Sequence, residues 1–355
     1  MIHGPFLRKM EEPQNKRIVF TGKQQVRLES GAVAEPGPGE VRIRTHTSLM
    51  STGTENIVFN RNFDAGTHWD HWVKYPFYPG YALSGTVESI GEGIPDFIPG
   101  DRVVARCQHQ SHPIIKVDQC LPLPDGIDMS IAPWFALAKI AFHGAMAASY
   151  RMGDCAVIIG AGPIGQMSLR WARAAGAASV IVVDPAPERE SFALKGGASV
   201  FIASTAGAAQ AQILELNRGA APDVVVDTTG HSAVFADSLR LVRPGGRVVL
   251  LGDTGSPGSQ SLTSDFIGKG VTLVGAHDTH LIPGWDPARM TRFFFQLLLD
   301  GRFQLDSLNT HHFSPDDCAA AYETANRLRQ QTMGIVFDWI GTARQVRKRA
   351  LPARI

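Results

Sequence analysis

A short glycine-rich run in the middle of the chain has the spacing of a pyrophosphate-binding turn. The run GAGPIG covers residues 160–165, follows the apolar segment CAVII, and is followed by a helix-like segment. In a G-x-G-x-x-G turn between a strand and a helix, the first glycine permits the tight turn and the second lets the backbone approach the pyrophosphate. The third allows close packing of helix on strand. Because a helix N-terminus also carries partial positive charge, the run predicts a dinucleotide site.

An acidic residue lies where such a site contacts the adenosine ribose. Asp184 ends the apolar run 180–183 and comes 19 residues after Gly165. A carboxylate there accepts hydrogen bonds from the ribose hydroxyls and repels a 2′-phosphate, so we expect NAD rather than NADP. Arg189 is the feature that weakens this preference, since it either stacks on the adenine or reaches a phosphate. The complete predicted cofactor site is Gly160, Gly162, Pro163, Ile164, Gly165, Asp184, Arg189, Thr229, Gly252 and Ala276.

The segments around this site alternate between strand and helix patterns. A helix-like stretch, 132–148, leads into the first strand, and further apolar strands are expected at 180–183, 200–202, 224–226, 247–251 and 272–274. Helical segments such as 165–175 and 233–241 lie between them. This alternation is typical of a doubly wound parallel sheet, the α/β class in which dinucleotides bind.

The first third of the chain is different, because short strand-like runs are separated by Pro and Gly clusters. Strands are expected at 17–20, 25–28, 40–45, 83–90 and 102–106. Many short strands with such turns suggest an antiparallel, barrel-like unit. After residue 285 come a helix, an amphipathic helix near 315–329 and a last strand at 334–337, and then a basic tail, 341–355, expected to be a frayed or solvated end.

Composition excludes several classes of partner. The 355 residues carry 34 Lys and Arg against 33 Asp and Glu, a net charge of +1, which gives no reason to expect binding to nucleic acid or to an anionic membrane. No apolar run is long enough to span a bilayer, and the polar N-terminus has no signal-peptide core, so we expect a cytoplasmic protein. The four cysteines have no C-x-x-C spacing and predict neither a disulfide framework nor a zinc knuckle.

The order of these elements and several motifs resemble the medium-chain dehydrogenase/reductase family, near its polyol and secondary-alcohol dehydrogenases. The resemblance covers nearly the whole chain, and its markers are PGPGEVRIR, PGYALSGTV, PGDRV, LPLPDGI, GAGPIGQ, VVVDPAPER and RPGGRVVLLG. It implies a GroES-like, β-rich catalytic domain (1–137), a Rossmann domain (138–284) and a return to the catalytic domain with the tail (285–355). It also implies a small-molecule substrate in the cleft against the nicotinamide and a homodimer or homotetramer.

The departures from that family concern zinc. Where zinc-using members have C-G-T-D and G-H-E, this chain has Thr52-Gly53-Thr54-Glu55 and Gly80-Tyr81-Ala82, and the third ligand position falls near Ala136. A catalytic zinc needs about three protein ligands of the Cys, His or carboxylate type. The lobe that would hold a structural zinc has only Cys107 and Cys120 instead of four cysteines. We therefore expect both zinc sites to be missing.

Without zinc, another group must move the hydroxyl proton. Thr54 matches the proton-relaying hydroxyl of the zinc branch, Tyr81 replaces a ligand and would point into the same cleft, Lys139 would supply a cation, and Glu55 would accept a proton or bind a hydroxyl. Each has a structural alternative: Thr54 a helix N-cap, Tyr81 core packing, Lys139 a surface group, Glu55 a first-turn carboxylate.

Histidine and tryptophan mark two further segments. Three H-x-x-H pairs occur in loop-like sequence, where contact with substrate is a better interpretation than a metal site. The predicted substrate contacts are His71, Trp72, His277 and His280.

Three functions compete at this point. The leading one is a zinc-independent, NAD-dependent dehydrogenase acting on a secondary alcohol such as a sugar or polyol, which rests on Asp184 and the polyol-type loop. The second is an NADPH-dependent enone or quinone reductase, and the third is a cofactor-binding protein without catalysis.

Overall fold

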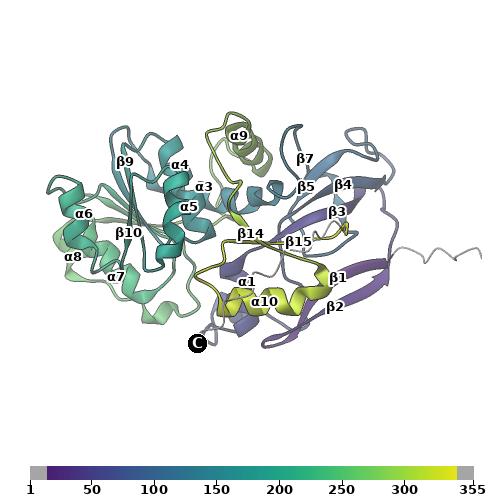
Figure 1. The fold of residues 1–355 in the computed structure, drawn as a ribbon, viewed down its shortest axis with the longest axis horizontal. Helices are drawn as coiled ribbons and strands as arrows, with labels where there is room; N and C mark the ends of the chain where they lie inside the picture. Colours follow the sequence, from purple (N-terminus) through teal and green to yellow (C-terminus); the bar gives the residue numbers. More distant parts are fainter. Residues whose placement is uncertain (1–13, 342–355) are drawn as a thin grey trace, which may run out of the picture.

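The computed structural model describes residues 14–341, which form an α/β lobe and a β-rich lobe side by side (Figure 1). None of the helices within these residues combines the length and hydropathy needed to cross a membrane. The predicted basic tail lies, apart from its first residue, outside the described part of the chain.

The α/β lobe is built on six parallel strands. They are β8 (Cys155–Ile159), β9 (Ser179–Asp184), β10 (Val200–Ala203), β11 (Val224–Asp227), β12 (Arg247–Leu250) and β13 (Thr272–Gly275), in the spatial order β10-β9-β8-β11-β12-β13. The helices are α4 (Pro163–Ala174), α5 (Glu190–Lys195), α6 (Gln210–Leu216), α7 (Ser232–Leu241) and α8 (Ser264–Gly268). The chain runs outward from β8 to β10 and then restarts at β11, so the order reverses between β8 and β11, where such sheets bind ligands. The predicted doubly wound sheet is confirmed.

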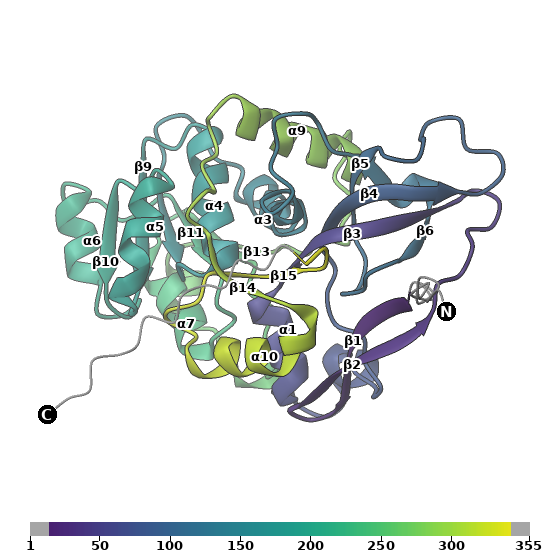
Figure 2. The ribbon, with the colours of Figure 1, turned by 45° about the vertical axis from the view of Figure 1, so that its right-hand side comes forward.

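The second lobe is a mainly antiparallel sheet. Its strands are β3 (Glu40–Met50), β4 (Leu83–Ile90), β5 (Arg102–Ala105), β6 (Ile114–Lys116), β7 (Cys120–Pro122), β14 (Asn309–Phe313) and β15 (Gly334–Asp338). Its helices are α1 (Thr52–Asn60), α2 (His68–Trp72) and α10 (Cys318–Arg327). β15 pairs antiparallel with β3, and α10 lies beside α1 (Figure 2), so the end of the described chain completes the lobe that the beginning started.

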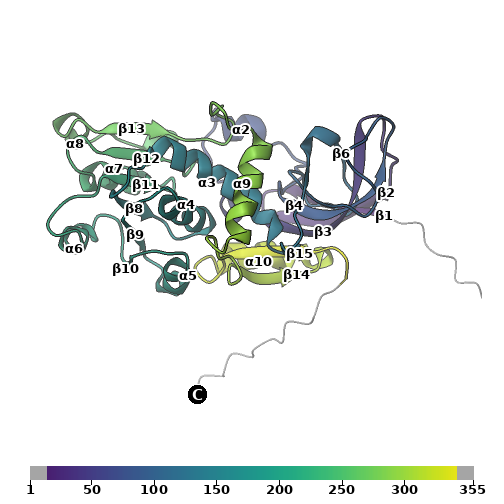
Figure 3. The same ribbon diagram turned by 90° about the horizontal axis from the view of Figure 1, so that it is seen from above.

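Two helices occupy the junction between the sheets. Figure 3 shows α3 (Phe135–Ala148) and α9 (Pro287–Leu299) between the parallel and the antiparallel sheet. A short 3-10 turn, Ala132–Trp134, precedes α3. One apolar cluster includes Leu49 and Val104 from the β-rich lobe, Phe142 from α3, and Ile158 from β8. Because this cluster is continuous, α3 connects the two walls of the cleft described below.

Several features of the fold differ from the sequence predictions. β1 (Gln14–Gly22) and β2 (Gln25–Ala32) form a two-stranded ribbon outside the seven-stranded sheet, and isolated bridges join β1 to Phe77 and Gln110. β14 was not expected, because its polar sequence NTHHF lacks strand alternation. α2 is a helix in a segment predicted as loop, begun by the side chain of Thr67, which accepts a hydrogen bond from the Asp70 amide. The predicted domain boundary between residues 137 and 138 falls inside α3.

Candidate active site

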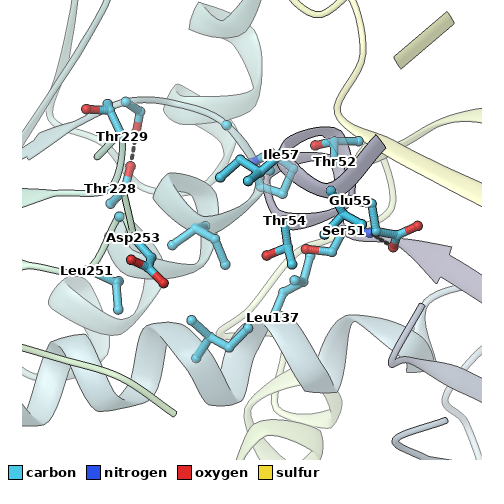
Figure 4. Close-up of a pocket in the computed structure, with 18 of the residues that line it drawn as sticks. Ser51, Thr52, Thr54, Glu55, Ile57, Leu137, Thr228, Thr229, Leu251 and Asp253 are labelled. Atoms are coloured by element: carbon cyan, nitrogen blue, oxygen red, sulfur yellow. Dashed lines mark hydrogen bonds between the residues drawn. The ribbon is translucent and has the colours of Figure 1, made fainter. Parts of the chain in front are cut away.

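A cleft of about 1310 Å³ lies between the two lobes and receives side chains from both. Figure 4 shows part of it, with α1 residues on one side, Thr228, Leu251 and Asp253 on the other, and Leu137 of α3 below. The predicted cofactor residues all line this cleft: Gly160, Gly162, Pro163, Ile164, Gly165, Asp184, Arg189, Thr229, Gly252 and Ala276.

The glycine-rich turn has the backbone that the motif requires. Gly160 follows β8 with a φ of 93°, a conformation that favours glycine, and α4 begins at Pro163 with Gly162 as N-cap. A Cβ on Gly165 would lie 1.8 Å from the carbonyl oxygen of Gly160, so only glycine lets the helix approach the strand this closely. The amides at the N-terminus of α4 thereby face the cleft, where a pyrophosphate fits.

A buried arginine supports this turn from behind. Arg170 is 2% exposed and donates to the backbone and side-chain oxygens of Gln166 at 2.9 and 3.0 Å. Gln166 in turn donates from Nε2 to the carbonyl oxygen of Ala161 at 3.1 Å. Burial lowers the pKa of Arg170 to about 10, which still leaves the guanidinium charged at neutral pH. This chain of hydrogen bonds fixes the turn before any ligand arrives.

Asp184 lies at the end of β9 as predicted, but its carboxylate is already engaged. One oxygen accepts from the Ala161 amide at 2.7 Å and from Nη1 of Arg189 at 2.8 Å, and the other accepts from the Ala186 amide at 2.8 Å. Arg189 also donates to the carbonyl oxygen of Arg329 at 2.9 Å. The arginine therefore offsets part of the negative charge of the carboxylate that was expected to repel a 2′-phosphate.

The loops after β11 and β12 close the other end of the cofactor site. Asp227 accepts from both the amide and the hydroxyl of Thr229 at 2.7 Å, which fixes the loop after β11. A Cβ on Gly252 would lie 2.4 Å from the amide nitrogen of Gly230, so the two loops touch through glycine backbone. Burial raises the pKa of Asp227 above its ordinary value, against the hydrogen bonds of Thr229.

Tyr81 lines the cleft beside the hydroxyls at the start of α1. Its hydroxyl donates to Oγ of Ser51, and the guanidinium carbon of Arg106 lies 4.9 Å from the centre of its ring. Burial raises the pKa of Tyr81, while the hydroxyls of Ser51 and Thr54 and the charge of Arg106 oppose that rise. Tyr81 is therefore a neutral phenol at neutral pH, adjacent to a cation that stabilises its anion.

The cation beside Tyr81 is Arg106 and not Lys139, contrary to the sequence prediction. Lys139 does not line the cleft, since its ammonium donates to the carbonyl oxygen of Asp278 at 3.0 Å and lies 3.7 Å from that residue's carboxylate. Burial lowers the pKa of Lys139, and the charge of Asp278 opposes this shift. Asp278 also forms an ion pair with Arg106, so one carboxylate from the loop after β13 holds two cations, Arg106 from the end of β5 and Lys139 from α3.

Glu55 borders the cleft but directs its carboxylate into a buried cluster. The side chain accepts from the Ser51 amide at 2.7 Å and the Tyr322 hydroxyl at 2.5 Å, and lies 3.2 Å from Nε2 of His109. Glu55 is 2% exposed and His109 is fully buried. Its structural alternative, a carboxylate in the first turn of α1, describes it better than a role in binding substrate hydroxyls.

The predicted substrate contacts divide into two pairs. Trp72 and His277 line the cleft, whereas His71 and His280 do not. His71 caps its own segment, with Nδ1 2.7 Å from the carbonyl oxygen of Thr67. His280 contributes a backbone oxygen to His143 at 3.1 Å. Because successive residues of helix α2 point in different directions, Trp72 faces the cleft and His71 does not.

The positions that hold the catalytic zinc in the resemblance carry no Cys, His or carboxylate in this chain. Within residues 14–341, no group of three or more His, Cys, Asp or Glu side chains is placed to hold a metal. Thr52 and Tyr81 occupy the first two ligand positions of the resemblance, and Ala136 at the third is fully buried. Cys107 and Cys120 are both buried free thiols, and burial raises the pKa of Cys120 to about 12, which disfavours the thiolate that binds metal.

Sequence reasoning missed three residues of the site. Ser51 directly precedes the run TGTE, and only Thr54 and Glu55 of that run were predicted as catalytic residues. Arg106 and Asp278 come from loops after β5 and β13, and no spacing in the sequence links them. His277, which is adjacent to Asp278, was predicted as a substrate contact, but the carboxylate of Asp278 was not predicted to take part in the site.

Comparison with known proteins agrees with this architecture. The chain matches the family model of the alcohol dehydrogenase GroES-like domain over residues 37–154 and that of the zinc-binding dehydrogenase domain over residues 163–284. It is 26% identical to human sorbitol dehydrogenase (88% of this chain, 93% of that protein) and 27% identical to L-threonine 3-dehydrogenase of Anaeromyxobacter dehalogenans strain 2CP-C (88% and 94%).

A similar solved structure is a protein of Sinorhizobium meliloti 1021 described as a zinc-binding dehydrogenase and bound to NADP. It has a TM-score of 0.77 at 18% identity, over 92% of this chain and 100% of the other. The two domain matches follow one another along the chain: the first covers β3 to β7 of the β-rich lobe together with α3, and the second covers β9 to β13 of the parallel sheet. The chain therefore belongs to the zinc-type medium-chain dehydrogenase/reductase family, a family of oxidoreductases.

Proposed function

We propose that the protein is a zinc-independent, NAD-dependent dehydrogenase that transfers hydride between a secondary alcohol, sugar-like or polyol-like, and NAD. The main support for this proposal is the position of Tyr81 in the cleft. A phenol stands in the cleft at a position where zinc-using relatives have a ligand, bonded to Ser51 and beside the guanidinium of Arg106. The names of the sorbitol and threonine dehydrogenases support a substrate with a CH–OH group.

The residues that line the cleft could bind every part of the cofactor. The turn at residues 160–165 would hold the pyrophosphate, Asp184 with Arg189 would meet the adenosine ribose, and Thr229, Gly252 and Ala276 would border the nicotinamide. When bound, NAD accepts the hydride that an alcohol carbon releases, or returns it as NADH to a carbonyl.

The proton is handled by the protein's own hydroxyls. In the direction of carbonyl reduction, neutral Tyr81 donates its proton to the forming alkoxide; in alcohol oxidation, the tyrosinate accepts it. The hydroxyl of Ser51 accepts the Tyr81 hydrogen bond, and Thr54 lies alongside for relay. Arg106 stabilises the tyrosinate, and its ion pair with Asp278 fixes its position across the cleft. Lys139 positions Asp278 and takes no proton itself.

Removing metal is expected to leave activity unchanged. Dialysis against a strong chelator should not alter the rate of NAD reduction with a panel of secondary alcohols, because the described residues offer no three-ligand site. Metal analysis of the active protein should find far less than one zinc per chain.

The control for chelation is a dehydrogenase with a demonstrated catalytic zinc, treated in parallel, which must lose its activity. Loss of activity in the present protein, with recovery on adding zinc, would contradict zinc independence.

Cofactor preference is tested by binding. We expect NADH to bind at least tenfold more tightly than NADPH, a difference of about 1.4 kcal/mol, because the Asp184 carboxylate lies at the ribose end of the site. The Asp184→Asn variant should reduce this ratio, and Arg189→Ala should increase it by removing the cation that offsets part of the carboxylate's charge. Fluorescence titration of both cofactors measures the two ratios, and tighter binding of NADPH to the unmodified protein would refute the preference.

The ion pair between Asp184 and Arg189 favours a second candidate, an NADPH-dependent enone or quinone reductase. With the negative charge of the carboxylate partly offset and Arg329 also lining the cleft, a 2′-phosphate meets less repulsion than the sequence suggested. Turnover of enones with NADPH, and none of alcohols with NAD, would select this alternative.

Assembly and location stay predictions. Among the described strands, β13 lies at one end of the parallel sheet and has no neighbour beyond it, which suits a homodimer or homotetramer formed at that edge. The mass in solution tests this assembly. A cytoplasmic location is proposed as well, and this proposal rests on the sequence alone.

A further inference from the structure

Aromatic side chains form one wall of the cleft, on and just after α2. Trp69 is 4% exposed and lies against Trp72, with ring centres 5.7 Å apart. Trp72 also meets Phe77 edge to face, with centres 5.1 Å apart at 85°. Although it is held from two sides, Trp72 is 52% exposed. An indole that is fixed by two rings and still open to the cleft is a rigid flat surface for a ligand.

Polar groups border the same wall. His68 on α2 is largely exposed, and its Nε2 lies 2.9 Å from the carboxylate of Asp253 on the opposite lobe. Within the described residues, the buried indole N–H of Trp69 has no hydrogen-bond acceptor. Arg106 and Gln108 line the cleft as well. The wall thus combines a flat apolar surface with donors and acceptors around it.

We propose that this wall, formed by His68, Trp69, Trp72 and Phe77, binds the ring form of a sugar, a pyranose or its glycoside, as the alcohol to be oxidised. The proposal rests on the proposed function and names its substrate class. A pyranose ring has an apolar face of C–H groups, which suits the exposed indole of Trp72, and hydroxyls around its edge, which suit His68 and Asp253. Pockets of this composition fix a ligand by a few placed polar groups on an apolar surface.

The two other kinds of alcohol fit less well. An open-chain polyol has no flat face to cover Trp72. A purely apolar ring would remove water from the pair of His68 and Asp253 without replacing its hydrogen bonds, which costs free energy.

The reaction on a ring sugar balances in the ordinary way. The carbinol carbon loses hydride to NAD and its hydroxyl loses a proton to the Tyr81 tyrosinate. One C–H and one O–H bond break, a C=O bond forms, and NAD is reduced to NADH.

The first test measures turnover. With NAD, methyl glucopyranoside, methyl galactopyranoside and glucose are compared with sorbitol, 2,3-butanediol and 1-phenylethanol. At least one ring sugar should have a kcat/KM tenfold above that of sorbitol. Trp72→Ala should raise the KM for that sugar tenfold or more with little change in kcat, Trp72→Phe should restore part of the loss, and the KM for 2,3-butanediol should change far less than the KM for the sugar. Met152→Ala, an exposed apolar residue outside the cleft, serves as the matched control.

The second test measures binding of the same sugars to the protein saturated with NADH, by calorimetry. A preference for sorbitol or 1-phenylethanol in both tests, or an equal effect of Trp72→Ala on ring and open-chain alcohols, would overturn the inference. Binding of a ring sugar that depends on Trp72, without oxidation of any alcohol, would uphold this site and overturn the proposed function alone. Absence of sugar binding, with alcohols still oxidised, would do the reverse.

Discussion

The Tyr81→Phe variant is expected to lower kcat by a factor of about 10² to 10⁴, the usual contribution of a positioned proton donor or acceptor. The substitution removes one oxygen, which bonds to Ser51, and keeps the ring under Arg106. Binding of NADH should therefore be unchanged, and steady-state rates with the best alcohol, together with a cofactor titration, measure both quantities.

The pH dependence gives a second readout on the same residue. Because burial raises the pKa of Tyr81 above its ordinary value of 10.0, the phenol stays protonated throughout the neutral range. Alcohol oxidation, which needs the tyrosinate, should then accelerate about tenfold per pH unit up to about pH 10, whereas carbonyl reduction, which needs the phenol, should be flat there. In Tyr81→Phe, the slope for oxidation should disappear.

A matched control removes a phenolic hydroxyl elsewhere. Tyr75 donates to the carbonyl oxygen of Val58 at 3.2 Å and does not line the cleft, so Tyr75→Phe should keep both kcat and the pH profile. If Tyr81→Phe retains full activity while Thr54→Ala loses it, the threonine is the group that exchanges the proton and the assignment of Tyr81 is wrong.

The cofactor half of the cleft could be predicted because its determinants are local in sequence. The tight turn at Gly160, the close packing at Gly165 and the placement of Asp184 at a strand end all follow from residues within about 25 positions of one another. Local spacing could not predict that the carboxylate of Asp184 is already paired with Arg189. Arg189 is only five residues away, but its choice between carboxylate, adenine and phosphate depends on Arg329, which approaches from the other lobe.

The catalytic half depends on contacts between distant segments, and for that reason prediction from sequence was weaker there. Lys139 had the right charge and lies near the cleft, yet Asp278 binds it, and Arg106 takes the place beside Tyr81. Glu55 likewise had suitable chemistry, but His109 and Tyr322 draw its carboxylate into the core. The partners that fix Lys139 and Glu55 lie more than 50 residues away from them in the sequence. Tyr81 and Arg106 are closer in sequence, but they lie just before β4 and just after β5, so pairing of the two strands brings them together.

The Gly162→Ala variant is expected to fold normally and to bind NADH at least tenfold more weakly, a loss of about 1.4 kcal/mol or more. Its backbone, with φ of −70° and ψ of −175°, suits alanine, and the added Cβ would meet only Nη1 of Arg189, at 3.7 Å. The methyl group therefore costs the empty protein little. It occupies the space through which a pyrophosphate must approach the backbone, which is the role of the second glycine in this turn.

The neighbouring Gly165→Ala variant separates cofactor binding from folding. Its Cβ would collide with the Gly160 carbonyl oxygen at 1.8 Å, so the backbone must move and the melting temperature should fall together with NADH binding. Gly162→Ala should instead keep the melting temperature of the unmodified protein measured without cofactor, and should lose most of the stabilisation that added NADH provides. If Gly162→Ala binds NADH normally, the pyrophosphate does not lie on this turn; if it melts early without cofactor, the glycine serves packing and not the ligand.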